Sequence, residues 1–379
     1  MATQPRLLYI SPVIPALTGN GLAMRAGTVL EALADRHEVH LLVFPLYASV
    51  TPQIPEPLEK LCCRSTLVSP RWRQVSGRRT APVWKETRFD VVHLFRLATL
   101  RFAEPYLRGF FRRPQRHLDL DDIESVTRRR LAALYRQNGH TGLAEREEAE
   151  ALRAKEHEDA ALRRFDRVYV CSASDAAQLA GRTRARLGVL PNAVRPPQTV
   201  PPRARRAVFT FFFVGTLGYY PNEDAVRWLC SEIVPRMRES AGSEFVVNIA
   251  GTGASESLRQ AANVPNVSFV GAVPDLSPWY AQADAVLAPV RAGGGTRIKI
   301  LEAFSFARPV VATSIAIEGI DARAEEHVVL GDSPAEFAQQ CVRLMSDAEL
   351  CARLGRNARA LVDQSYSIPS LQRALEQIG

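Results

Sequence analysis

Two patterns, short apolar runs and longer helical stretches, alternate along almost the whole of this 379-residue chain. Such alternation is typical of α/β domains built on a parallel sheet. It breaks once, over residues 191–202, where five of the twelve residues are proline. Proline fixes φ and lacks a backbone N–H, so this segment is predicted to be a linker. The sequence therefore predicts an α/β chain of two Rossmann-like domains that face each other across a cleft.

The expected strands are apolar runs, each followed by a helical pattern or a glycine-containing turn. Before the linker they cover residues 7–10, 39–44, 66–68, 91–94, 116–120, 168–171 and 186–190, and after it 209–214, 245–250, 267–270, 285–288 and 310–313. Helices are predicted over residues 22–34, 126–137, 144–164 and most of 334–379. Ligands of open parallel sheets bind beside the carboxyl ends of the strands, so we expect the functional residues in the loops there.

Composition narrows the class of protein. Hydrophobic residues make up 46% and charged residues 23%, which is typical of a globular chain. No apolar run approaches the roughly 20 residues that cross a bilayer, and the N-terminus shows no features of a signal peptide. The six cysteines lack metal-ligand spacing, which indicates reduced thiols. We expect a cytoplasmic protein of bacterial type with no metal site.

The formal charge of +8 is unevenly distributed. Residues 1–200 contain 31 Lys and Arg against 21 Asp and Glu, whereas the rest contain 17 against 19. Clusters at 71–79, 112–116 and 128–130 indicate either peripheral contact with an anionic membrane at its inner face or a solvated surface. The second interpretation fits a chain in which only four of 48 basic residues are lysine. No binding motif supports nucleic acid as a partner.

The segment with the clearest chemistry, residues 289–313, reads PVRAGGGTRIKILEAFSFARPVVAT. A strand is predicted to end at its first proline, three glycines form a turn, and a helix begins near Thr296. Backbone N–H groups in glycine turns and at helix N-termini bind anions. Arg297 and Lys299 add cations suited to two neighbouring phosphates, and Glu302 lies where it can accept hydrogen bonds from a ribose. A plain structural turn, with Glu302 in a salt bridge, is the alternative.

This segment resembles the donor site of the retaining glycosyltransferases of family 4, which have the GT-B fold. Members typically have a glycine-rich turn, a Thr-Arg-Leu-Lys-like stretch, Leu-Glu-Ala and Pro-Val-Val. The resemblance implies that Glu302 holds the ribose of a nucleotide-diphosphate sugar and that Arg297 and Lys299 act catalytically at the diphosphate. It also implies that the turn contributes three donor-binding residues, Gly294, Gly295 and Thr296.

Further loops extend the resemblance over nearly the whole chain. Residues 213–226 are similar to the first strand, loop and helix of the family's C-terminal domain, and residues 191–194 to its hinge. Two later loops match as well, of which the second commonly touches the base, and an N-terminal glycine loop commonly lies against the donor phosphate. The resemblance thus assigns donor binding to Gly21, Gly215, Gly251 and Val273.

Two departures from the family pattern concern the donor. Many members have a second Glu where this chain has Gly294, so the contacts of the donor sugar stay open. Many also have an Arg and a Lys in the loop where residues 217–222 have neither, which shifts the phosphate contacts to Arg297 and Lys299.

An acidic run at residues 119–124 follows a predicted strand. Many family members have a His at the position of Asp121, near the acceptor hydroxyl, so the resemblance implies that Asp121 accepts a proton or orients the acceptor. Two alternatives stay open. Asp119 and Asp121 also fit the two-carboxylate metal motif of the other glycosyltransferase fold, and Asp122 or Ser125 could cap the next helix.

Three aromatic side chains carry weaker signals. His93 ends a strand and is either a core residue or part of the cleft. Trp279 and Tyr280 are expected to pack in the interior and not to stack on a sugar.

The resemblance implies an acceptor domain at residues 1–195, a nucleotide-sugar domain at 205–365 and a terminal helix, 366–379, that packs back on the first domain. The predicted activity is transfer of a sugar from a nucleotide-diphosphate sugar to a glycan, lipid-linked or small-molecule acceptor, with retention of configuration and without a cofactor. Polysaccharide biosynthesis is the expected context. A nucleotide-sugar epimerase and a catalytically degenerate nucleotide-sugar-binding protein are the alternatives.

Overall fold

The computed structural model describes residues 4–47, 52–68, 84, 87–108, 113–200, 207–242 and 244–378. The chain forms two compact units. The first comprises residues 1–126, 149–192 and 368–379, and the second comprises 127–148 and 193–367. The basic cluster at 71–79, together with Arg112, lies outside the described residues.

A parallel sheet of seven strands forms the centre of the first unit, in the order β3-β2-β1-β4-β5-β6-β7. The order reverses between β1 and β4, and this reversal is where open α/β sheets bind ligands. The strands are β1 (Arg6–Ser11), β2 (Glu38–Val43), β3 (Cys62–Leu67), β4 (Val91–Phe95), β5 (Gln115–Asp121), β6 (Arg167–Val170) and β7 (Arg186–Val189).

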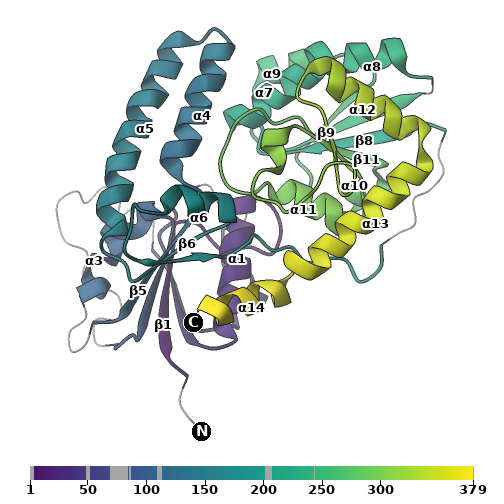
Figure 1. Ribbon diagram of the computed structural model, residues 1–379. Helices are drawn as coiled ribbons and strands as arrows, with labels where there is room; N and C mark the ends of the chain where they lie inside the picture. The colour runs from purple at the N-terminus through teal and green to yellow at the C-terminus, as the bar shows by residue number, and fades with distance from the viewer. Residues whose placement is uncertain are drawn as a thin grey trace. The chain divides into compact units, whose positions relative to one another are not determined.

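Helices of the first unit connect these strands, except for the terminal helix α14 (Figure 1). They are α1 (Gly21–Ala34), α2 (Glu56–Glu59), α3 (Leu100–Arg108), α6 (Ala173–Leu179) and the terminal α14 (Ile368–Ile378). Two long helices, α4 (Glu124–Gln137) and α5 (Thr141–Leu162), have one end in each unit. The terminal helix α14 packs against α1, so the two ends of the chain contribute to one unit.

The second unit contains a parallel sheet of six strands in the order β10-β9-β8-β11-β12-β13. Its strands are β8 (Phe209–Val214), β9 (Phe245–Ala250), β10 (Val267–Gly271), β11 (Ala285–Ala288), β12 (Val310–Ala312) and β13 (Val329–Leu330). Its helices are α7 (Tyr220–Trp228), α8 (Val234–Ser240), α9 (Glu256–Ala261), α10 (Ser277–Gln282), α11 (Ile298–Ser305), α12 (Pro334–Ser346) and α13 (Ala348–Ser365). Here the order reverses between β8 and β11.

The central strands are buried along their whole length because both faces of each sheet are covered. All six residues of β8, with the sequence FTFFFV, are buried, and so are all five of β4. This is the pattern of parallel sheets that carry helices on both sides.

The structure confirms the predicted α/β class and places every expected strand in a parallel sheet. Several boundaries differ from the expected ones by one to four residues. Strand β3 begins at Cys62, four residues earlier than expected, and β13 was not predicted because a two-residue strand has no periodicity to detect. Helix α11 begins at Ile298, two residues after the expected start. Among the described residues, no helix has the length and apolar character required to span a bilayer.

Candidate functional site

The glycine-rich segment of the second unit forms the turn between β11 and α11. Gly293 and Gly295 have φ values of 128° and 64°, which favour glycine. Arg297 is the N-cap residue of α11, and its Nη1 atom donates hydrogen bonds to the carbonyl oxygens of Gly294, at 2.8 Å, and of Gly295. The guanidinium therefore orders the turn and places positive charge at the start of the helix. The neighbouring Thr296 is buried.

Lys299 lies in the first turn of α11 and is partly buried. Its Nζ atom donates a hydrogen bond to Oδ1 of Asn222 at 2.8 Å and lies 4.6 Å from the centre of the Phe213 ring. Burial, and then the positive charge of Arg297, lower the pKa of Lys299 to about 7. A bound anion would stabilise the ammonium form, so this position suits a phosphate group.

Glu302 lies one turn after Lys299 and is also partly buried. The hydroxyl of Tyr280 donates a hydrogen bond to its Oε2 atom at 3.0 Å. Burial raises the pKa of Glu302 to about 7, and the bond from Tyr280 and the charge of Lys299 act in the opposite direction. Trp279 does pack against Phe212, as expected. Tyr280 packs too, but its hydroxyl contact was missed because the two partners are 22 residues apart in the sequence.

Three loops of the second unit meet at the carboxyl ends of β8, β9 and β10. A Cβ atom on Gly251 would lie 1.9 Å from the carbonyl oxygen of Gly215, so the two loops touch through their backbones. The N–H of Gly251 also donates to the carbonyl oxygen of Gly271 at 2.7 Å. Asn222, the partner of Lys299, fills the space beside Gly215. Val273 lies two residues beyond the edge strand β10 and is partly buried.

A second network of the same unit supports the glycine turn, and no pattern in the sequence indicated it. Arg291 pairs with the buried Asp224, with Nη2 and Oδ1 2.6 Å apart, and Nδ2 of Asn138 donates to the same Oδ1 atom. Nη1 of Arg130 donates to the carbonyl oxygen of Gly293 at 3.0 Å. The turn is therefore held by side chains from several parts of the unit.

In the first unit, Asp121 ends β5 with a φ of 64°, a conformation that strains residues other than glycine. Its Oδ1 atom lies 3.3 Å from Nε of Arg25, and its Oδ2 atom lies 3.4 Å from Nη1 of Arg96. The buried Asp119 pairs with Nη2 of Arg25 at 2.8 Å and accepts the backbone N–H of Asp121 at 3.0 Å. Both oxygens of the Asp121 carboxylate thus face a positive charge, which fixes its orientation.

Gly21 is the first residue of α1, after the N-cap residue Asn20. Arg25, one turn further along, is 1% exposed and connects α1 to the acidic end of β5. The structure therefore brings Gly21 and Asp121 to the same edge of the first sheet. The sequence contained a signal for Arg25, because a charged residue interrupts the apolar pattern of residues 21–33. Nothing in the sequence singled out Arg96.

The contacts of the acidic run bear on the two alternatives proposed for it, a metal motif at Asp119 and Asp121 and a helix cap at Asp122 or Ser125. Asp122 pairs with Arg96, and the hydroxyl of Ser125 donates to Oε2 of Glu158 at 2.7 Å. Asp119 and Asp121 both face Arg25. Within the described part of the chain, no group of three or more His, Cys, Asp or Glu side chains is arranged to hold a metal ion.

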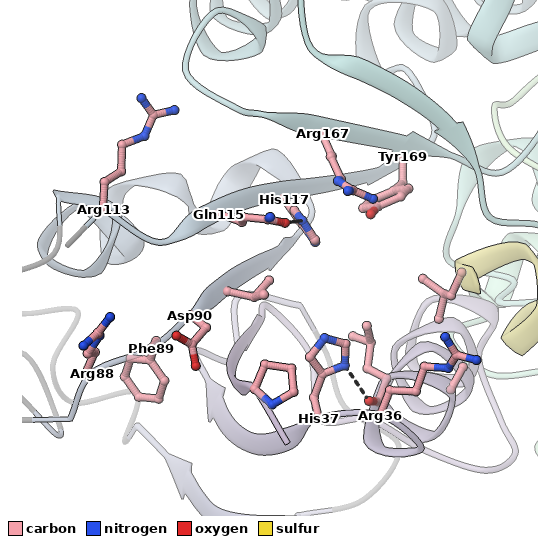
Figure 2. Close-up of a pocket in the computed structure, with 15 residues that line it drawn as sticks. Arg36, His37, Arg88, Phe89, Asp90, Arg113, Gln115, His117, Arg167 and Tyr169 are labelled. Carbon is pink, nitrogen blue, oxygen red and sulfur yellow. Dashed lines mark hydrogen bonds between the residues drawn. The ribbon is translucent and has the colours of Figure 1, made fainter. Parts of the chain in front are cut away.

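A cavity of about 460 Å³ lies in the first unit at the amino ends of β1, β4, β5 and β6 (Figure 2). Figure 2 shows arginine and histidine side chains around it, with His117 and Tyr169 on one side. The predicted site residues do not line it, and it lies at the edge of the sheet opposite to Asp121. His93 is a core residue, fully buried beside Tyr9 and Tyr169, and burial lowers its pKa to about 3.

Comparison with known proteins gives a family match within the second unit. Residues 208–347, which include the glycine turn and α11, match the family described as glycosyl transferases group 1. No curated protein matches the sequence.

Several solved structures match nearly the whole chain. A glycosyltransferase from Rickettsia africae ESF-5 matches with a TM-score of 0.69 and 12% identity over 98% of this chain and 97% of that one. Sucrose-phosphate synthase from Thermosynechococcus elongatus matches with a TM-score of 0.69 and 15% identity over 98% of both chains. Anabaena HepE in complex with UDP-glucose matches with a TM-score of 0.70 and 15% identity over 99% of both chains. At these identities the likeness concerns the fold, which is GT-B.

Proposed function

We propose that this chain, whose residues 208–347 match the family of glycosyl transferases group 1, transfers a sugar from a nucleotide-diphosphate sugar to an acceptor. The observation that carries the proposal is the pair Lys299 and Glu302, one turn apart on α11 directly after a glycine turn. The pair offers a cation for a phosphate and a carboxylate for a ribose, each on the same short helix.

The donor occupies the carboxyl edge of the second sheet. Its diphosphate lies at the turn formed by Gly294, Gly295 and Thr296, beside Arg297 and Lys299. Negative charge develops on the diphosphate as the bond to the sugar breaks, so cations already in place stabilise the transition state. Glu302 accepts hydrogen bonds from the ribose. The loops with Gly215, Gly251 and Val273 complete the nucleotide site of the second unit.

Asp121 orients the acceptor hydroxyl. Arg25 and Arg96 fix the orientation of the Asp121 carboxylate. The hydroxyl of the acceptor substrate can therefore donate its hydrogen bond in only one direction. In a retaining reaction by front-face attack, the acceptor proton passes to the departing phosphate oxygen, and the donor diphosphate itself serves as the base. The reaction as proposed uses no cofactor.

The acceptor is a glycan, a lipid-linked glycan or a small molecule, in the context of polysaccharide biosynthesis in the bacterial cytoplasm. The basic charge of residues 1–200 supports contact with an anionic membrane surface, where a lipid-linked acceptor would lie. Among the solved structures similar to this chain, Anabaena HepE is in complex with UDP-glucose, and WaaB is a lipopolysaccharide outer core galactosyltransferase.

The donor site is tested by thermal stabilisation with UDP-, GDP-, ADP- and dTDP-sugars, with NAD and an oligonucleotide as controls. One nucleotide family is expected to raise the melting temperature, and Glu302→Ala is expected to abolish the shift because the ribose loses its acceptor. A matched control is Glu349→Ala, an exposed glutamate near the start of α13, which should keep the shift.

Product analysis then separates the candidate activities. A glycosylated acceptor supports transfer, an isomerised donor without an acceptor identifies an epimerase, and binding without turnover identifies a degenerate protein. No shift with any nucleotide sugar, in folded protein, would contradict the donor site itself.

A further inference from the structure

Tyr280 is held rigidly on α10 of the second unit. Its side chain is 1% exposed, and its ring lies edge-on to Phe212, at 5.2 Å between centroids, and stacks on Phe306 at 5.5 Å. Its carbonyl oxygen accepts a hydrogen bond from Nε of the buried Arg308 at 3.0 Å. Packing and backbone contacts together therefore fix the direction in which the hydroxyl points.

The Tyr280 hydroxyl has one proton and two acceptors within reach. Oε2 of Glu302 lies at 3.0 Å and the backbone carbonyl oxygen of Lys299 at 3.3 Å. A carboxylate is the stronger acceptor, so the proton is directed to Glu302. A carboxylate has about four lone-pair sites, which leaves capacity for two further donors such as the hydroxyls of a ribose.

We propose that Tyr280 is a positioning residue of the donor site, whose hydroxyl keeps the Glu302 carboxylate oriented and ready to accept hydrogen bonds from the donor ribose. The inference rests on the proposed function of Glu302 and deepens it. Tyr280 touches no substrate atom and acts through Glu302.

The charges around Glu302 explain why one neutral hydroxyl matters. The charge of Lys299 on α11 and the hydroxyl of Tyr280 on α10 both lower the pKa of Glu302, and the charge of Arg297 lowers the pKa of Lys299. Burial already raises the pKa of Glu302 to about 7, and the bond from Tyr280 opposes that rise. Without the bond the pKa rises further, so at neutral pH the carboxyl is protonated and accepts fewer hydrogen bonds.

The test is Tyr280→Phe, which removes the hydroxyl and keeps the packed ring. Calorimetric titration from pH 6 to 9 uses whichever of UDP, GDP, ADP and dTDP binds the wild type. We expect binding about tenfold weaker at pH 7, the effect of one hydrogen bond to a charged group. The pH below which affinity falls should move upward, and the difference from the wild type should narrow at pH 9.

The matched control is Tyr366→Phe, the same change at a buried tyrosine whose hydroxyl accepts the backbone N–H of Asp321 at 2.8 Å. It should leave the pH profile unchanged. A second readout needs no ligand: the carboxyl carbon resonance of Glu302, assigned by its loss in Glu302→Gln, should titrate at higher pH in Tyr280→Phe than in the wild type.

The outcomes separate the inference from the proposed function. If Glu302→Ala abolishes binding while Tyr280→Phe changes neither affinity nor titration, the inference is wrong and the donor site stands. A loss of affinity that is equal at every pH indicates a merely structural role and also overturns it. Wild-type protein that binds none of the four nucleotides overturns the proposed function and the inference with it.

Discussion

Lys299 and Glu302 carry opposite charges one turn apart in surroundings that favour the neutral form of each. In Lys299 the folded pKa, about 7, lies below the value of 10.5 expected for an unfolded chain. Between these two values the unfolded state binds more protons, so the free energy of unfolding rises with pH. Below pH 7 the folded protein bears the full free-energy cost of burying the charged ammonium group. Such a cost is expected where a residue is selected to bind a ligand.

Lys299→Met is therefore expected to stabilise the unliganded protein by roughly 2 kcal/mol at pH 6 to 7, a value reduced for partial exposure. The gain should disappear towards pH 10.5, and nucleotide binding should be lost because the phosphate loses its cation. Urea unfolding at pH 6, 7 and 9.5 measures the first effect. A gain that is the same at pH 6 and pH 9.5 would show that the methionine acts through packing alone.

At the scale of elements, glycine sets how closely α13 approaches the end of α11. A Cβ atom on Gly355 of α13 would lie 2.2 Å from the carbonyl oxygen of Ala307, which follows α11. That neighbour is backbone and cannot rotate away. Gly142, near the start of α5, is exposed and has no heavy atom within 4 Å of a Cβ built on it.

The two glycines form a matched pair for substitution. Gly355→Ala is expected to lower the free energy of unfolding by about 1–3 kcal/mol, because α13 must move away from Ala307. Gly142→Ala is expected to raise it by up to about 1 kcal/mol, because alanine favours the helix. Denaturant unfolding of both variants measures the difference, and equal effects would contradict the steric account.

At the scale of the whole molecule, the uneven charge leads to a prediction about surfaces. Residues 1–200 carry the basic excess, whereas the remaining residues are slightly acidic. The protein is expected to sediment with vesicles that contain phosphatidylglycerol and not with pure phosphatidylcholine vesicles. Sodium chloride at 0.5 M should release it, because the screening length falls below the value of about 10 Å at 0.1 M. Equal sedimentation with both vesicles would leave the basic residues as a solvated surface.

Much of the fold could be predicted because its signals are local. Most buried strands, such as residues 209–214, are largely apolar runs, and helical patterns or glycine turns separate them from the next strand. Boundaries were less precise where no such signal exists, as at β3 and β13. The two units, however, each combine distant segments: residues 368–379 join the first and residues 127–148 the second. No local pattern indicates which distant segments pack together.

The sequence by itself determined the α/β class, and it singled out the segment from the glycine turn to Glu302 as a candidate, because both depend on residues close together in the chain. Only the tertiary structure revealed what surrounds those residues. Asn222 bonds to Lys299, Tyr280 to Glu302, and Arg25 to Asp121, across separations of 77, 22 and 96 residues. The contacts of Asn222 and Arg25 arise because parallel sheets bring the carboxyl ends of distant strands to one edge. Tyr280 reaches Glu302 from α10, the helix that precedes β11. Burial there changes the pKa of Lys299 and Glu302, which composition and spacing cannot predict.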